Sequence, residues 1–99
     1  MSRRGHDRER SVKRLLEEDG WLVVRAAGSL GYDLVALKDG FTPRVIEVKS
    51  TAGGPYERFG PSDRRELVDA AKAAGACAEL AYWPPRGQLR WIDSAEWPK

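Results

Sequence analysis

The sequence predicts an α+β fold in which a mixed central sheet of about five strands is flanked by two helices. Two stretches carry helical spacing or helix-start signals, and five short apolar segments lie between glycines and prolines. Their order along the chain is αβββαββ, which is typical of a sheet with helices packed against it. The 99 residues contain no internal repeat or linker, so we expect one domain over residues 1–99.

The first helix is predicted over about residues 4–19. Its apolar residues Val12, Leu15 and Leu16 recur at helical spacing and form one stripe that can pack on a sheet. Gly20 follows directly and is typical of a helix end.

Three strands are predicted next, and their β-branched residues distinguish them from the loops around them. They cover residues 21–25, 33–37 and 44–49. Glycines punctuate the loop at residues 26–31, and Gly40 marks the turn between the second and third strands. Residues 50–60 contain three glycines and a proline, and we expect a mobile surface loop there.

The second helix is predicted over about residues 61–74. A proline at its first position and a glycine directly after it are typical of a helix start and a helix end. The last two strands, residues 79–83 and 88–92, are expected to form a hairpin across residues 84–87.

The formal net charge of +2 conceals an uneven distribution. Residues 1–14 hold six basic and two acidic residues, a net of +4, and the remaining 85 residues carry −2. Twelve of the 17 basic residues are arginine, whose planar fork suits phosphate oxygens. Codon bias in a GC-rich genome explains the arginine content equally well, so composition alone leaves nucleic-acid binding open. The absence of asparagine is a weak indication of a thermophile.

Several classes of protein and site are disfavoured. No apolar run approaches the ~20 residues that span a bilayer, and no apolar stretch follows the basic amino terminus as in a secretory signal. The single cysteine, Cys77, leaves no internal disulfide or cysteine-based zinc site. Gly53-Gly54 lacks the lysine and spacing of a phosphate-binding loop, so no nucleotide cofactor is expected. These observations favour a cytoplasmic protein, nucleoid-associated or in the host cytoplasm if the source is viral.

Three polar residues interrupt the apolar strands and form the first candidate site. Glu47 and Lys49 lie two residues apart, so their side chains share one face of a strand. If the hairpin turns near Gly40, Asp33 falls across from Glu47 or its immediate neighbour. Two carboxylates and an ammonium group are therefore expected to converge at one end of the sheet.

This combination has the parts of a metal-assisted phosphodiester hydrolase. Two close carboxylates resist joint ionisation unless a cation joins them, and Mg²⁺ needs only one or two carboxylates with waters and a substrate phosphate. Lys49 would orient or help deprotonate the attacking water, or stabilise charge on the phosphate. A cross-strand ion pair on a solvated face accounts for the same three residues about equally well.

Glu9 is a fourth candidate because it shares the helical stripe of Val12 and Leu16. A carboxylate on a packed face is costly unless another group compensates it. Alternatively, Glu9 is a surface acid that complements the dipole of the first helix.

Four segments in register resemble the archaeal-type Holliday junction resolvases, which are small members of the restriction-endonuclease-like PD-(D/E)xK nuclease superfamily. Asp-x(n)-Glu-x-Lys is a weak pattern by itself, but its register with the helix glutamate and with Val24-Arg25-Ala26-Ala27-Gly28-Ser29 makes it specific. The resemblance is dense in the first half of the chain and looser beyond it. The segments are Arg4-Gly5 with Glu9-Arg10, Gly20 to Ser29, Asp33 to Ala36, and Ile46 to Lys49.

The resemblance implies a structure-specific endonuclease that depends on Mg²⁺, with Mn²⁺ able to substitute. The implied catalytic residues are Glu9, Asp33, Glu47 and Lys49. The implied metal ligands are Asp33, Glu47, Glu9 and the backbone carbonyl of Val48.

The same resemblance implies that the partner is branched double-stranded DNA. A homodimer would suit a two-fold symmetric four-way junction, which needs two nicks in opposed strands. Arg10, Arg25 and Ser29 match family positions near the active site that contact DNA or support catalysis. Further candidate phosphate contacts are Arg3 and Arg4 in the basic leading helix, and Arg58 and Arg64 beside the loop at residues 50–60.

The chain departs from the family pattern at two places. Tyr32 stands where the superfamily motif has proline, and residues 51–60 lack the lysine-rich character of relatives. Two alternatives therefore stay open. One is another small nuclease of the virus-type replication-repair group, acting on flaps or other branched DNA. The other is a non-catalytic DNA-binding module with the same fold.

Overall fold

A computed structural model describes the backbone of residues 3–26 and 32–98 and the side chains of residues 7–26 and 32–98. The predicted order αβββαββ is confirmed, and a short 3-10 helix, η1, follows the last strand. The elements are α1 (Arg3–Glu18), β1 (Leu22–Arg25), β2 (Leu34–Leu37), β3 (Arg44–Lys49), α2 (Pro61–Ala74), β4 (Cys77–Tyr82), β5 (Arg90–Asp93) and η1 (Ser94–Glu96).

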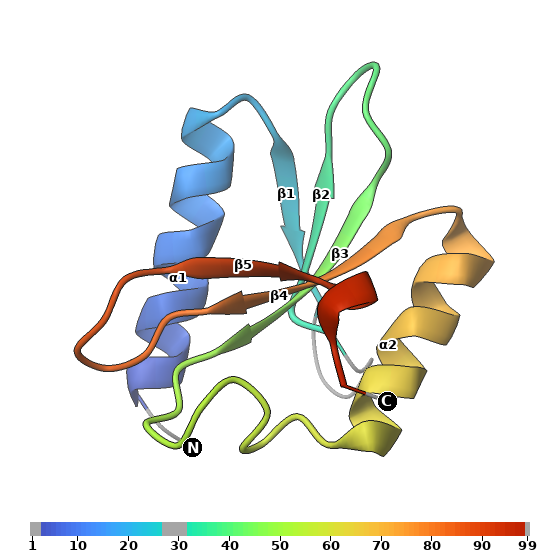
Figure 1. Cartoon of the computed structure of the whole chain (residues 1–99). Coiled ribbons are helices and arrows are strands. Elements are labelled where there is room, and N and C mark those ends of the chain that lie inside the picture. Colours follow the sequence, from blue (N-terminus) through green and yellow to red (C-terminus); the bar gives the residue numbers. More distant parts are fainter. Residues whose placement is uncertain (1–2, 27–31, 99) are drawn as a thin grey trace.

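The five strands form one sheet in the order β1-β2-β3-β4-β5 (Figure 1). β1, β2 and β3 are an antiparallel meander, β3 pairs with β4 in parallel, and β5 returns antiparallel to β4. The parallel pair is possible because α2 lies between β3 and β4 in the chain and returns it to the starting end of the sheet.

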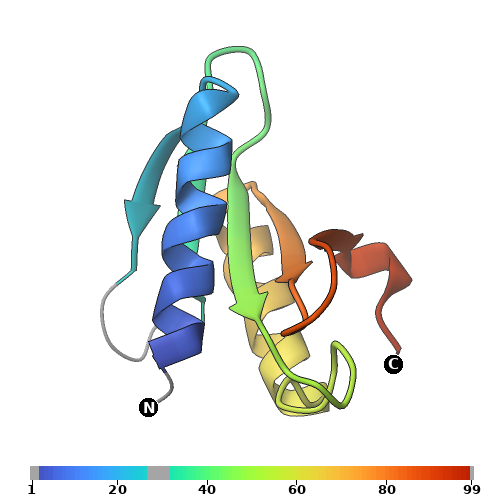
Figure 2. The ribbon, with the colours of Figure 1, turned by 90° about the vertical axis from the view of Figure 1, so that its left-hand side faces the viewer.

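Helix α1 covers one face of the sheet (Figure 2). Val12 and Leu16 are buried against residues of the first three strands, such as Ala36 and Ile46. Leu15, predicted to share this stripe, is 43% exposed because it lies about a hundred degrees round the helix from Leu16. Glu9, three residues before Val12, is partly buried.

Helix α2 covers the opposite face and packs mainly on β3 and β4. Its buried residues Leu67 and Ala71 contact a cluster that includes Phe59 and Trp97, whose rings pack edge to face. Gly75 ends the helix in the left-handed conformation that glycine adopts without steric cost. Because α2 stops short of the first two strands, Leu22, Val24 and Leu37 remain exposed.

The largest differences from the predicted boundaries lie in the last two strands. β4 begins at Cys77, two residues before the prediction, and β5 begins at Arg90, two residues after it. Backbone pairing with the buried strand β3 extends β4 at its start, and this pairing has no counterpart in the local sequence. The intervening segment is correspondingly longer and includes Pro84 and Pro85.

Strand β3 begins with an ion pair whose cation lies between a carboxylate and two aromatic rings. Arg44 donates two hydrogen bonds to Glu79, at 2.6 and 2.7 Å. Its guanidinium also lies 4.8 Å from the ring centroid of Trp21 and 4.9 Å from that of Trp91. A bidentate pair with aromatic rings beside the cation is a well-satisfied arrangement.

Candidate active site

The sheet brings the three predicted polar residues together at the end where β3 finishes. β2 pairs with β3 with Leu34 opposite Ile46, Asp33 directly precedes this pair, and its side chain lies against that of Glu47. The Asp33 N–H donates to the Ile46 carbonyl at 2.9 Å, so Asp33 is fixed although it precedes the strand. The side chains of Asp33, Glu47 and Lys49 therefore lie on one face, as strand periodicity predicts.

Two short contacts hold this cluster. The Val48 N–H donates to Asp33 Oδ2 at 2.7 Å, which orients one carboxylate. Lys49 Nζ lies 3.2 Å from Glu47 Oε2, and the two side chains are only 23% and 14% exposed. The second Asp33 oxygen and the Glu47 carboxylate are the oxygen donors that remain for a ligand.

The electrostatics of the cluster are unfavourable for Glu47. Burial and, second, the negative charge of Asp33 together raise the pKa of Glu47 from 4.5 to about 8, although Lys49 opposes the shift. A carboxyl group held this far from its ordinary pKa lacks sufficient positive charge nearby. The cluster would therefore gain from a cation that joins both carboxylates.

The donor set fits a hard divalent cation, Mg²⁺ or Mn²⁺. Among the described residues, no group of three or more His, Cys, Asp or Glu side chains is placed to hold a metal. Two carboxylates are nevertheless sufficient for Mg²⁺, which keeps several waters and uses substrate phosphate oxygens as further ligands. The carbonyl of Val48 as a ligand stays a prediction.

Glu9 is engaged by a different partner. Its Oε1 accepts a hydrogen bond from Arg25 Nε at 3.1 Å, and the side chain is 18% exposed. Arg25, at the end of β1, is the compensating group that a carboxylate on the packed stripe of α1 requires. Glu9 stands on the helix that covers the other face of the sheet, so its role beside Asp33 and Glu47 stays a prediction.

The predicted phosphate contacts fall into three groups. Arg10 and Arg58 are exposed, and the Arg25 side chain is 54% exposed despite its contact with Glu9. Arg64 is a correction: it is 8% exposed, and its Nη1 donates to the buried Phe59 carbonyl at 2.6 Å. The side chains of Arg3 and Arg4, and Ser29 as a whole, lie outside the described residues.

Sequence reasoning missed the role of Arg8, which it counted only as part of the basic leading helix. Arg8 turns inward and contacts the segment after β4 through Trp83, Pro84 and Pro85. The two consecutive prolines indicated a turn, but nothing in the local pattern connects that turn with a residue on the first helix.

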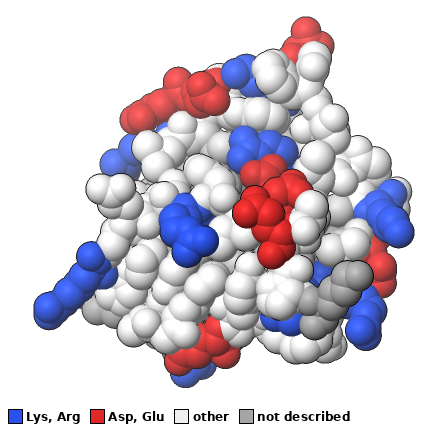
Figure 3. All heavy atoms as spheres, in the orientation of Figure 1, with Lys and Arg blue, Asp and Glu red and all other residues white. Residues whose placement is uncertain are grey.

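Charge is unevenly distributed over the surface. The largest acidic group in the view of Figure 3 lies near the centre, where Figure 1 has β5 and η1. Asp93 and Glu96 belong to these elements. Basic side chains project at the left margin of the same view, on the side of the loop between β4 and β5. A polyanion is therefore favoured at that margin over the acidic centre.

Among the described residues, no helix is both long enough and apolar enough to cross a membrane.

Comparison with known proteins points to one family. The family model of the archaeal Holliday junction resolvase (Hjc) matches residues 1–97. The crossover junction endodeoxyribonuclease Hjc of Methanocaldococcus jannaschii is 53% identical over 79 residues, which cover 80% of this chain and 58% of that protein. The match thus spans less than two thirds of the relative's length.

A solved structure is similar over nearly the whole chain. It is the 1.6 Å structure of Archaeoglobus fulgidus Hjc, a Holliday junction resolvase from an archaeal hyperthermophile. The TM-score is 0.76 at 27% identity, and the match covers 97% of this chain and 79% of that one. The predicted fold is thereby confirmed, including its two helices and mixed five-stranded sheet.

Proposed function

Because this chain belongs to the archaeal Holliday junction resolvase family, we propose that it is a divalent-cation-dependent endonuclease that resolves four-way DNA junctions by paired symmetric nicks. The observation that carries the proposal is the cluster of Asp33, Glu47 and Lys49. The cluster holds two carboxyl groups close together, and the pKa of Glu47 is about 8. A bound cation would lower this pKa and stabilise both carboxylates.

The reaction is hydrolysis of a phosphodiester, in which water attacks phosphorus in line and the bond to the 3′ oxygen breaks. The products are a 5′-phosphate and a 3′-hydroxyl. Mg²⁺, when bound, supplies positive charge to the phosphate and lowers the pKa of a bound water. Asp33 and Glu47 would hold the cation, with the Val48 N–H keeping the Asp33 carboxylate oriented.

Lys49 has the position of a group that acts on the attacking water or on the phosphate. Its ammonium contacts Glu47 at 3.2 Å and is partly open to solvent. It can hold the water by a hydrogen bond or stabilise charge that develops on the phosphate oxygens. Glu9, paired with Arg25, would complete the acidic side of the site, and Arg10, Arg25 and Arg58 would contact phosphates.

We infer that the active form is a homodimer. Leu22, Val24 and Leu37 leave an apolar area on the outer face of β1 and β2, with side chains 64%, 50% and 38% exposed. A second copy that covers this face would place two sites about a dyad, which matches the symmetry of a four-way junction. Sedimentation at micromolar concentration tests this, and an 11.1 kDa species alone, with and without junction DNA, would refute it.

The deciding experiment compares cleavage of a four-way junction with cleavage of a flap, a splayed arm and a linear duplex, all in Mg²⁺. We expect paired symmetric nicks on the junction alone. The Asp33→Asn variant should not cut but should still bind the junction, because asparagine keeps an acceptor for the Val48 N–H and loses only the charge.

The other outcomes support the alternative functions. Comparable cleavage of flaps, splayed arms and junctions would favour a replication-repair type of nuclease. Junction binding by the wild type without cleavage, in either Mg²⁺ or Mn²⁺, would favour a DNA-binding module.

A further inference from the structure

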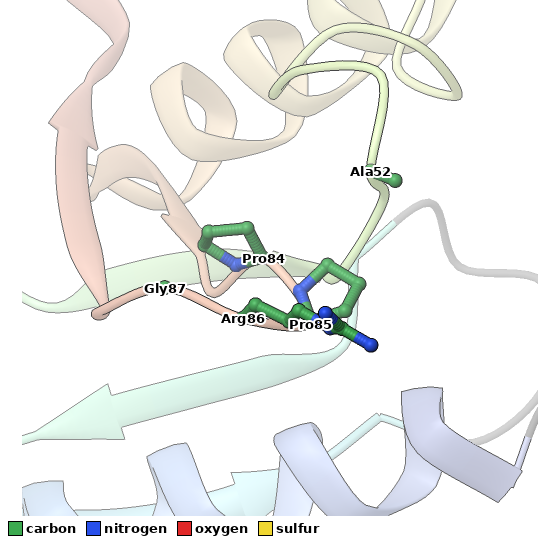
Figure 4. A pocket seen from close by; sticks show the side chains of 5 residues that line it. All are labelled: Ala52, Pro84, Pro85, Arg86 and Gly87. Carbon is green, nitrogen blue, oxygen red and sulfur yellow. The ribbon is translucent and has the colours of Figure 1, made fainter.

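The loop between β4 and β5 forms one wall of an open groove beside the candidate active site. The groove has a volume of about 460 Å³ and is lined by Ala52 and by residues 84–87 (Figure 4). The groove lies near the end of β3, because Ala52 follows Lys49 by three residues and the Trp83 N–H donates to the Lys49 carbonyl at 2.8 Å.

Arg8 fastens this loop to α1. Its Nη2 donates to the carbonyls of Pro84 and Pro85, at 3.1 and 3.4 Å, and its guanidinium lies 4.4 Å from the centroid of the Trp83 ring. The Nε of Arg8 is buried without a hydrogen-bond partner, which costs free energy. Arg8 therefore holds the loop between β4 and β5 although one of its own N–H groups lacks a hydrogen-bond partner.

The loop is also tightly built. Its two prolines fix φ at two consecutive positions, and the Gly87 N–H donates to the Pro84 carbonyl at 3.2 Å. A Cβ added at Gly87 would lie 2.6 Å from Pro84 Cγ, so a larger residue there would force the turn open. The groove therefore has a wall that is fixed before any ligand binds, which lowers the entropic cost of binding.

Arg86 supplies the charge on this wall. It is exposed, and the ion pairs between described residues do not include it, in contrast to Arg8, whose guanidinium is used within the fold. An exposed guanidinium beside an apolar proline surface suits the phosphate and the sugar of one nucleotide.

We propose that this groove binds the DNA strand adjoining the scissile phosphate, with Arg86 on a backbone phosphate and Pro84 and Pro85 against a deoxyribose. The proposal rests on the proposed function, since it takes the same DNA as its ligand. Arg8 then has the role of a positioning residue, which holds the groove wall in place but does not touch the DNA.

The first test measures junction binding in an Asp33→Asn background, where binding is separated from cleavage. Arg86→Gln should weaken binding roughly three- to tenfold at moderate salt and reduce the salt dependence of log K by about one. Lys72→Gln is the matched control, because Lys72 is an exposed cation in the last turn of α2, and it should change neither quantity. Arg86 is exposed, so its loss should not affect folding.

The second test locates the contact with junctions that carry one uncharged methylphosphonate at successive positions of the cleaved strand. Neutralising one phosphate next to the cut should weaken binding by Asp33→Asn but not by Asp33→Asn/Arg86→Gln, as expected for two groups in contact. Additive losses at every phosphate, or unchanged affinity and salt dependence in Arg86→Gln, would overturn the groove proposal alone. Failure of wild type and Asp33→Asn to bind any DNA would overturn the proposed function and the groove together.

Discussion

Strand β3 carries charged residues at both ends, and the two ends differ in how well those charges are satisfied. At its start, Arg44 has one carboxylate held by two short hydrogen bonds and two aromatic rings beside its guanidinium. At its end, Glu47 has one lysine contact of 3.2 Å and a second carboxyl group, Asp33, beside it, and the pKa of Glu47 rises to about 8.

The difference separates a well-satisfied ion pair from the proposed catalytic cluster on the same strand. A charged group that contributes only to folding is expected to have its charge compensated. In the Arg44–Glu79 pair both charges are compensated. The pKa of Glu47 is raised mainly by burial and secondly by Asp33, and a carboxyl group shifted this far is typical of sites completed by a ligand. Substitutions at the two ends should therefore change different measured quantities.

The largest expected effect is a loss of DNA cleavage, and we expect it from a substitution of Lys49 at the end of β3. Lys49→Met should lower the single-turnover rate of junction cleavage by about 10²- to 10⁴-fold, because the group that acts on water or phosphate is lost. Arg44→Met is the matched control on the same strand and should cut at close to the wild-type rate once folded. Equal losses of rate in both variants would erase the distinction between the two ends.

The next largest expected effect is a loss of stability, and we expect it from a substitution of Arg44 at the start of β3. Arg44→Met should lower the free energy of unfolding by about 3 kcal/mol, because it leaves Glu79 partly buried without its partner. Urea denaturation measures this, and the double variant Arg44→Met/Glu79→Met should recover most of the loss. A single variant as stable as wild type would mean that the pair contributes nothing despite its geometry.

The smallest effect is a gain of stability at the finishing end. Folding raises the pKa of Glu47 from 4.5 to about 8, so the metal-free wild type should lose stability as pH rises through this range and Glu47 ionises. Glu47→Gln cannot ionise and should be about 2 kcal/mol more stable than wild type at pH 6, where Glu47 is ionised in the unfolded but not in the folded wild type, and nearly equal to it near pH 4. Urea denaturation in EDTA at both pH values measures the difference.

Mg²⁺ at pH 9 should act differently on wild type and on Glu47→Gln. Binding to the folded state should stabilise wild type and leave Glu47→Gln nearly unchanged. If the metal-free wild type proved as stable as Glu47→Gln at pH 9, ionisation of Glu47 would not destabilise the folded protein, and this prediction would be wrong.

Much of the candidate site was predictable because local rules fix it. Strand periodicity puts Glu47 and Lys49 on one face, and a short antiparallel connection puts Asp33 opposite them, so boundary errors of one residue did not matter. The same logic found the order of the elements. It also placed Glu9 on the buried stripe of α1.

The errors concern contacts between residues far apart in the chain or placed by tertiary packing. The position of Arg64 beside the loop at residues 50–60 predicts a phosphate contact, but the loop before α2 folds back and presents the Phe59 carbonyl to it. Arg8 has the same charge and helix as its neighbours, and only the docking of the last hairpin separates its role from theirs. No spacing rule predicts either contact.

The contact between Arg8 and Pro84 can form only late during synthesis of the chain. The two residues are separated by 76 positions, so a ribosome adding about 5 to 20 residues per second needs roughly 4 to 15 s between them. Once Lys49 has been added, about midway through this interval, α1 and the meander that carries Asp33, Glu47 and Lys49 have been synthesised, but the supporting residues Trp83 and Pro84 have not. A nascent chain therefore lacks the support beside the end of β3 until its last hairpin has been made.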